Sequence, residues 1–96
     1  MPHALSDDAI RDALAELPGW RHEGSALRKR FTFGGFPEAI SFITRIAFDA
    51  ERLDHHPELR NVYGTVDVAL TTHDAGNRVT ERDVALARRI EAISWV

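Results

Sequence analysis

The chain has 96 residues, of which 44% are hydrophobic and 28% are charged, and its formal net charge is -3. This length fits one domain, residues 1–96, and the composition is ordinary for a globular protein. The negative charge argues against a broad nucleic-acid interface, which needs a basic face. The absence of cysteine excludes a disulfide framework and a thiolate zinc site. No apolar run reaches the roughly 18 residues of a membrane span, and the polar N-terminus is unlike a signal peptide, so a cytoplasmic protein is expected.

Hydrophobic periodicity and turn residues predict elements in the order α-β-β-α-β-β-α. This order favours an α+β domain in which a four-stranded antiparallel sheet carries three helices on one face. The predicted elements are a helix over 7–17, strands at 20–22 and 26–33, a helix over 37–53, two strands within 57–73 and a helix after Thr80.

Capping residues support these boundaries. Ser6 is a suitable N-cap for the first helix, which Pro18-Gly19 ends. Pro57 forces the chain out of helix after the long central segment, whose broad apolar stripe a sheet and a second subunit would cover. Thr80 and Asp83 are spaced as in a capping box at the start of the last helix.

Hairpin geometry makes a prediction about distant histidines. A two-residue turn at Tyr63-Gly64 would place Asp54 opposite His73 and His56 opposite Thr71. Diagonal neighbours on one face of a sheet lie roughly 7–8 Å apart. We therefore expect His56 and His73 to project to the same side, at the open end of the hairpin.

Adjacent His55 and His56, together with His73, form a candidate catalytic group. Imidazole has an ordinary pKa of about 6.5, so one ring can donate a proton while another accepts one. This pair of tasks suits eliminations and dehydrations. Glu51, one helical turn before His55, is placed to orient or tune that ring.

The residues alone leave two other interpretations open. Histidines next to a proline also occur in solvated or capping loops. Three histidines with a carboxylate are credible ligands for zinc or iron, although neither an HxH nor an HxxxH spacing is present. In the acid–base interpretation, Trp20 or Tyr63 would offer a surface on which a flat aromatic substrate stacks.

The spacing of these residues resembles the signature of the pterin-4a-carbinolamine dehydratase family. The similarity covers about residues 5 to 95, and the loop from Asp74 to Val79 is slightly longer than in many members. The matching positions are Glu51-x3-His55-His56-Pro57, Tyr63, Thr72-His73-Asp74 and Thr80-Glu81-Arg82-Asp83, with Pro18-Gly19-Trp20 and FTFGGFPEAISFI before them.

The resemblance implies the dehydration of 4a-hydroxytetrahydropterin to quinonoid dihydropterin, which makes the protein a hydro-lyase that requires no cofactor. His55 and His73 would handle protons, His56 would bind and polarise the pterin, and Glu51 would tune His55. Asp83 would support the last helix. The remaining expected substrate-binding residues, which shape the pocket wall, are Pro57, Thr72, Asp74 and Trp20.

The resemblance also implies a homodimer or homotetramer, and a functional link to an aromatic amino acid hydroxylase whose tetrahydropterin is recycled. The alternative is a non-catalytic dimerisation module, because the family includes coactivators of a homeodomain transcription factor. The presence of all three histidines favours the enzyme, since a scaffold does not need them.

Overall fold

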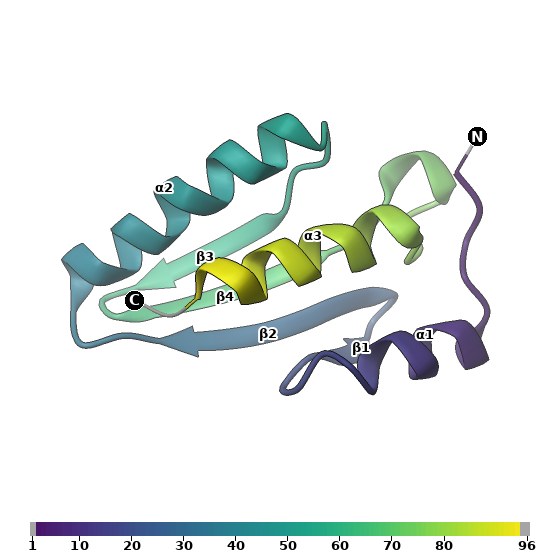
Figure 1. The fold of residues 1–96 in the computed structure, drawn as a ribbon, viewed down its shortest axis with the longest axis horizontal. Coiled ribbons are helices and arrows are strands. Elements are labelled where there is room, and N and C mark those ends of the chain that lie inside the picture. The colour runs from purple at the N-terminus through teal and green to yellow at the C-terminus, as the bar shows by residue number, and fades with distance from the viewer. Residues whose placement is uncertain (1, 95–96) are drawn as a thin grey trace.

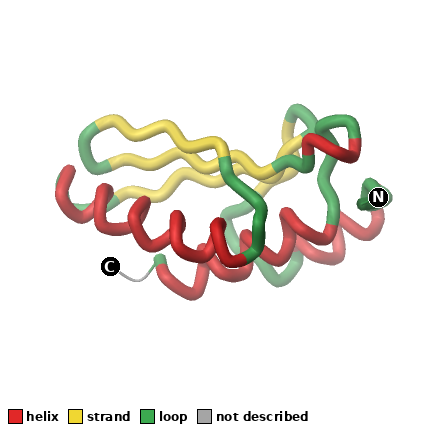
Figure 2. The backbone as a smooth tube through the Cα atoms, turned by 90° about the horizontal axis from the view of Figure 1, so that it is seen from above, coloured by secondary structure: helices red, strands yellow, loops and turns green. Residues whose placement is uncertain are grey.

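The computed structural model describes residues 2–94 and shows a sheet layer against a helical layer (Figures 1 and 2). The predicted α+β fold and its order of elements are confirmed. Trp95, expected to pack against the chain terminus or a second subunit, lies outside the described residues. The elements are α1 (Asp7–Leu14), β1 (Arg21–Glu23), β2 (Ala26–Thr32), α2 (Phe36–Arg52), β3 (Glu58–Val62), β4 (Thr65–Leu70), the 3-10 helix η1 (His73–Ala75) and α3 (Glu81–Ile93).

The strands form one antiparallel sheet in the order β1-β2-β4-β3. In the β3–β4 hairpin Val62 pairs with Thr65, and the same register continues along both strands, which confirms the predicted turn at Tyr63-Gly64. A Cβ added at Gly64 would lie 2.8 Å from the carbonyl oxygen of Phe33, so a side chain does not fit there. The register fixes which residues meet at the open end of the hairpin.

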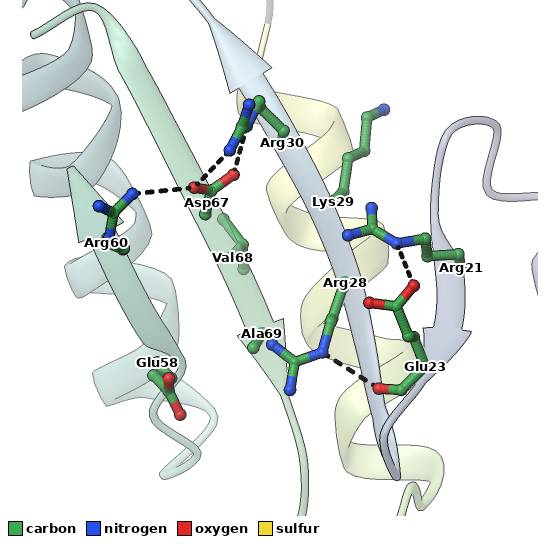
Figure 3. Close-up of a pocket in the computed structure, with 10 residues that line it drawn as sticks. All are labelled: Arg21, Glu23, Arg28, Lys29, Arg30, Glu58, Arg60, Asp67, Val68 and Ala69. Atoms are coloured by element: carbon green, nitrogen blue, oxygen red, sulfur yellow. Dashed lines mark hydrogen bonds and ion pairs between the residues drawn. The ribbon is translucent and has the colours of Figure 1, made fainter. Parts of the chain in front are cut away.

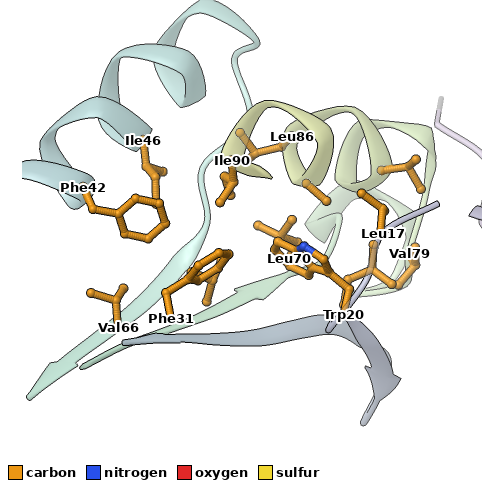
Figure 4. Packing of buried hydrophobic residues seen from close by; sticks show 14 of the residues in the cluster. Leu17, Trp20, Phe31, Phe42, Ile46, Val66, Leu70, Val79, Leu86 and Ile90 are labelled. Atoms are coloured by element: carbon orange, nitrogen blue, oxygen red, sulfur yellow. The ribbon is translucent and has the colours of Figure 1, made fainter. Parts of the chain in front are cut away.

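The core lies between the inner face of the sheet and the helices (Figure 4). Alternate residues of each strand point inward, because successive strand side chains face opposite sides of a sheet. Each large apolar side chain that is fully buried here contributes about 1.5–3 kcal/mol. The core includes Leu27 and Phe31 of β2, Val66, Val68 and Leu70 of β4, Phe42 and Ile46 of α2, and Leu86 and Ile90 of α3.

The first helix is shorter than predicted. The side chain of Ser6 accepts a hydrogen bond from the amide of Ala9, which confirms the N-cap, but α1 ends at Leu14. After it, the amide of Leu17 bonds back only three residues, to the carbonyl of Leu14. Pro18 restricts the residue before it, so the last turn tightens although Leu17 still reaches the core.

Helix α2 begins and ends one residue earlier than predicted, after an N-cap at Gly35. Its inner stripe packs on the sheet, and part of its apolar surface remains exposed. Phe36 is 54% exposed and Ile40 is 39% exposed. None of the helices described for residues 2–94 has the length and apolar content that crossing a membrane requires.

Candidate active site

All three candidate histidines line one cleft of about 250 Å³ at the open end of the β3–β4 hairpin. His55 and His56 follow α2, and His73 follows β4. Because the hairpin returns antiparallel on itself, positions 17 residues apart in sequence reach the same place. The cleft is also lined by Asp54, Thr71, Thr72, Asp74 and Arg82.

The end of α2 turns His55 towards the interior. Asp54 adopts a left-handed conformation with φ of 50°. The amide of His55 donates to the carbonyl of Ala50 at 3.0 Å, and the amide of Asp54 donates to that of Glu51 at 3.1 Å. These two bonds form a Schellman motif, which reverses the chain after a helix. His55 is consequently only 8% exposed, whereas the next residue, His56, is exposed.

Asp83 is fully buried and holds His55 in place. Its Oδ1 lies 2.6 Å from His55 Nε2. Its Oδ2 accepts hydrogen bonds from the Thr72 hydroxyl and the Thr80 amide, each at 2.8 Å. The Thr80 contact is part of the predicted capping box of α3, which is confirmed. Asp83 therefore supports the helix as predicted, and it also ties together the ends of α2, β4 and α3.

The carboxylate determines which nitrogen of His55 is available. An ionised carboxylate only accepts hydrogen bonds, so His55 Nε2 carries a hydrogen and donates it to Asp83. Nδ1 is then the ring nitrogen left to meet a ligand. The bond is buried, and a charge-assisted hydrogen bond of this kind is stronger than a neutral one.

Glu51 contacts His56 rather than His55, the ring that it was expected to orient or tune. Glu51 Oε1 lies 2.8 Å from His56 Nε2, and both side chains are largely exposed. That expectation placed Glu51 one helical turn before His55, but the helical conformation ends before His55. Asp54 leaves the helical conformation, so His55 swings inward to Asp83 and His56 takes the outer position. An exposed pair of this kind contributes at most about 1 kcal/mol.

His73 is the first residue of η1 and has a neutral partner. Its Nδ1 lies 3.2 Å from Oδ1 of Asn77. The loop that carries both residues is closed by a backbone bridge between Thr72 and Arg78, with the Thr72 amide 2.9 Å from the Arg78 carbonyl oxygen. The three imidazoles thus have three different partners, which are a buried carboxylate, an exposed carboxylate and an amide.

Three other expected substrate-binding residues lie in or beside the cleft. Thr72 lines it, but its hydroxyl donates to Asp83, so its contribution is support of the carboxylate. Asp74 lines the cleft with an exposed side chain. Pro57 is half-buried between His56 and the first residue of β3.

The expected aromatic stacking residues do not line the cleft. Trp20 is 6% exposed in the core, where its Nε1 donates to Glu91 at 2.8 Å and its ring meets Phe31 edge-on. A buried indole needs a partner for its N–H, and α3 supplies one. Tyr63 is 83% exposed at the tip of the hairpin, at the end opposite to the cleft. Neither ring therefore forms part of the wall of this cleft, where a stacking surface was expected.

Arg82 and Thr71 line the cleft although neither was an expected site residue. Arg82 is exposed in the first turn of α3. The capping box was the available signal, because it fixes Asp83 inward and thereby places its neighbour at the cleft. Asp54 was signalled by the predicted hairpin register, which placed it opposite His73, and both residues line the cleft.

A metal site would require several histidine or carboxylate side chains that point at one position. Within residues 2–94, no group of three or more His, Asp or Glu side chains is arranged to hold a metal ion. What the cleft does hold is three imidazoles, each with one ring nitrogen hydrogen-bonded to a side-chain oxygen. Such an arrangement can give and take protons.

A second hollow, of about 260 Å³, lies on the outer face of the sheet and is lined mainly by charged residues (Figure 3). Arg30 donates to Asp67 at 2.7 and 3.2 Å, and Arg60 lies 3.8 Å from the same carboxylate. The hydrogen bonds from Arg30 hold the pKa of Asp67 below its usual value, and Asp67 raises the pKa of Arg30. The charges are mostly paired with each other, as expected for a solvated face.

Comparison with known proteins gives a consistent result. The family model described as pterin 4 alpha carbinolamine dehydratase matches residues 3–93. A protein of Opitutus terrae with the provisional name pterin-4-alpha-carbinolamine dehydratase is 56% identical over 96 residues, covering 100% of this chain and 99% of its own. A protein of Afipia carboxidovorans with the same provisional name is 55% identical, covering 98% of this chain and 95% of its own.

Two solved structures share the fold. A crystal structure from Brucella melitensis, described as a transcriptional coactivator/pterin dehydratase, superposes with a TM-score of 0.90 at 41% identity, covering 95% of this chain and 98% of that one. A pterin dehydratase-like protein, described as a RuBisCO assembly factor in the alpha-carboxysome, superposes with a TM-score of 0.68 at 28% identity, covering 80% and 90%.

Proposed function

The chain belongs to the pterin 4 alpha carbinolamine dehydratase family, and on this basis we propose that it converts 4a-hydroxytetrahydropterin into quinonoid dihydropterin and water. The observation that carries the proposal is the shared cleft, where three imidazoles from two distant segments meet. Their hydrogen-bond partners differ, so the rings are suited to different tasks.

The reaction needs one acid and one base. The bond between C4a and the hydroxyl oxygen breaks as that oxygen takes a proton and leaves as water. A ring N–H loses its proton to the base, and the electron pair left behind forms the new double bond. No net oxidation occurs, and each proton transfer requires a group that titrates near neutrality, as imidazole does.

We assign the proton transfers to His55 and His73. His55 has Nδ1 available in the cleft, while its Nε2 is held by Asp83. His73 approaches from the opposite segment, and its Nε2 is available because Nδ1 faces Asn77. His56 binds and polarises the pterin from the outer side, with Glu51 keeping its ring oriented.

The chemistry would serve to recycle a tetrahydropterin cofactor of an aromatic amino acid hydroxylase. A freshly generated 4a-carbinolamine, followed by absorbance, tests the activity directly. Acceleration above the uncatalysed rate that disappears on substitution of His55 and His73 supports the proposal. A folded protein that leaves the uncatalysed rate unchanged contradicts it.

We further propose a homodimer or homotetramer that forms through α2. Phe36, Ile40, Ile43 and Ala47 repeat at spacings of four, three and four residues, which places them along one side of the helix. Ile43 is half-buried and the other three are exposed. Spacing of this kind is typical of helices that pack together, and covering the stripe would remove apolar surface from water.

A non-catalytic dimerisation or coactivator-type module is the second candidate. The exposed apolar stripe of α2 favours it, and the two structural relatives are described as a coactivator/dehydratase and as an assembly factor. An interaction module does not need a buried carboxylate bonded to a cleft histidine. The His55–Asp83 pair therefore favours the enzyme.

A further inference from the structure

We propose that Asn77 is a positioning residue that fixes the tautomer and orientation of His73 in the cleft. This inference rests on the proposed dehydratase function for its catalytic consequence. The contact itself joins Nδ1 of His73 to Oδ1 of Asn77 at 3.2 Å. An amide oxygen only accepts hydrogen bonds, so Nδ1 carries the hydrogen and Nε2 keeps its lone pair.

The backbone around Asn77 is built to hold this contact. Gly76 and Asn77 both have positive φ, of 72° and 58°. Asparagine is one of the few residues other than glycine that tolerates this region. The bridge between Thr72 and Arg78 closes the loop on either side. The amide side chain is thus presented to His73 by a short loop whose ends are fixed.

The tautomer of His73 is the reverse of those of the other two rings. His55 and His56 each donate from Nε2 to a carboxylate, which leaves Nδ1 available. His73 donates from Nδ1, which leaves Nε2 available. Nε2 is the ring nitrogen farther from Cβ, so the available lone pair of His73 lies farther from its own backbone than an Nδ1 lone pair would. Without an acceptor at position 77, nothing else among the hydrogen bonds of residues 2–94 selects this tautomer.

Five other titratable or charged groups line the cleft with His73. They are two carboxylates, two imidazoles and one guanidinium, so the local field is mixed in sign. None of these groups is hydrogen-bonded to the His73 ring in the described part of the chain. The groups are Asp54, His55 and His56 from the α2–β3 connection, Asp74 from η1 and Arg82 from α3.

Two substitutions separate the side chain from the backbone. Asn77→Gly keeps the positive φ and removes the acceptor. Asn77→Asp keeps an acceptor oxygen on a residue that also tolerates positive φ. The readout that does not depend on activity is the ring-nitrogen NMR spectrum of His73 at about pH 8, above the ordinary imidazole pKa. Thermal unfolding of each variant checks that the fold is kept.

The expected result is an Nδ1–H tautomer in the wild-type protein, lost in Asn77→Gly and kept in Asn77→Asp. Turnover in Asn77→Gly should show a kcat that is about fivefold lower and a KM that changes little. Fivefold is the factor for losing one ordinary hydrogen bond.

A wild-type His73 without hydrogen on Nδ1, or a tautomer unchanged by Asn77→Gly, overturns the contact. A lost tautomer with unchanged kcat overturns the positioning role. A wild-type protein without turnover instead overturns the dehydratase proposal, and the spectrum still decides whether Asn77 sets the tautomer.

Discussion

His55 Nε2 and Asp83 Oδ1 lie 2.6 Å apart in the interior, although 28 residues separate them in the chain. Asp83 is fully buried and also caps α3, so one carboxylate serves the helix and the candidate catalytic ring. A buried carboxylate that lost its donors would be costly, which makes this cluster sensitive to substitution.

Asp83→Asn tests this cluster. The amide can present an N–H where His55 needs an acceptor, which would force the ring into its other tautomer. We expect kcat to fall roughly tenfold or more. We expect the free energy of unfolding to fall by about 1–3 kcal/mol. Turnover measurements and urea unfolding check the two effects, and a variant with wild-type kcat would show that the pair is structural only.

Thr72→Val tests the support of Asp83. Thr72 is 2% exposed and its hydroxyl donates to Asp83 Oδ2, so valine of nearly equal shape removes one donor. We expect the free energy of unfolding to fall by about 1–2 kcal/mol. Thr71→Val is the matched control, because that hydroxyl bonds to a backbone carbonyl at an exposed position. The control should change stability by no more than about 0.5 kcal/mol, and equal losses in both variants would contradict the assigned role.

The sequence predicted the backbone of the site better than its side-chain partners. The turn at Tyr63-Gly64 was readable from strand residues on both sides, and it set the register that brings His73 to His56. The partner of His55 was not readable in this way. It depends on the left-handed conformation of Asp54, after which the two adjacent histidines meet different partners.

Trp20 shows a second limit of sequence reasoning. An aromatic residue after a Pro-Gly turn is compatible with a pocket wall and with the core. The deciding feature was Glu91 on α3, 71 positions away, which accepts a hydrogen bond from the indole nitrogen. Long-range pairing of this kind depends on how the helices pack, and local patterns do not specify it.

Lowering the pH should reduce the contribution of the Arg30–Asp67 ion pair, on the outer face of the sheet, to the free energy of unfolding. Because the pKa of Asp67 is lowered by Arg30, its ion pair stabilises the fold at pH values above the ordinary carboxyl pKa of about 4. That contribution is lost as the pH falls through the lowered folded-state pKa. Urea unfolding from pH 7 down to about pH 2.5, well below the ordinary carboxyl pKa, should show a stability difference between wild type and Asp67→Asn that shrinks towards acid. A difference that stays constant over this range would contradict the prediction.

Ile40→Glu tests the proposed α2 interface. Ile40 is 39% exposed on the apolar stripe, and a carboxylate there would have to be desolvated in a helix–helix contact. We expect the dissociation constant of the oligomer to rise roughly tenfold or more. Ser41→Glu is the matched control, because it adds the same charge at the neighbouring exposed position. Sedimentation equilibrium measures both, and a wild-type protein that is already monomeric would contradict the proposed interface.

The most direct test of the central claim is carbinolamine turnover by His55→Ala, His73→Ala and the double variant, with His56→Ala beside them. If His55 and His73 carry the two proton transfers, each single substitution should lower kcat roughly 10²- to 10⁴-fold, with the double variant near the uncatalysed rate. His56→Ala should mainly raise KM. Full kcat in either His55→Ala or His73→Ala, in a protein that remains folded, would contradict the account.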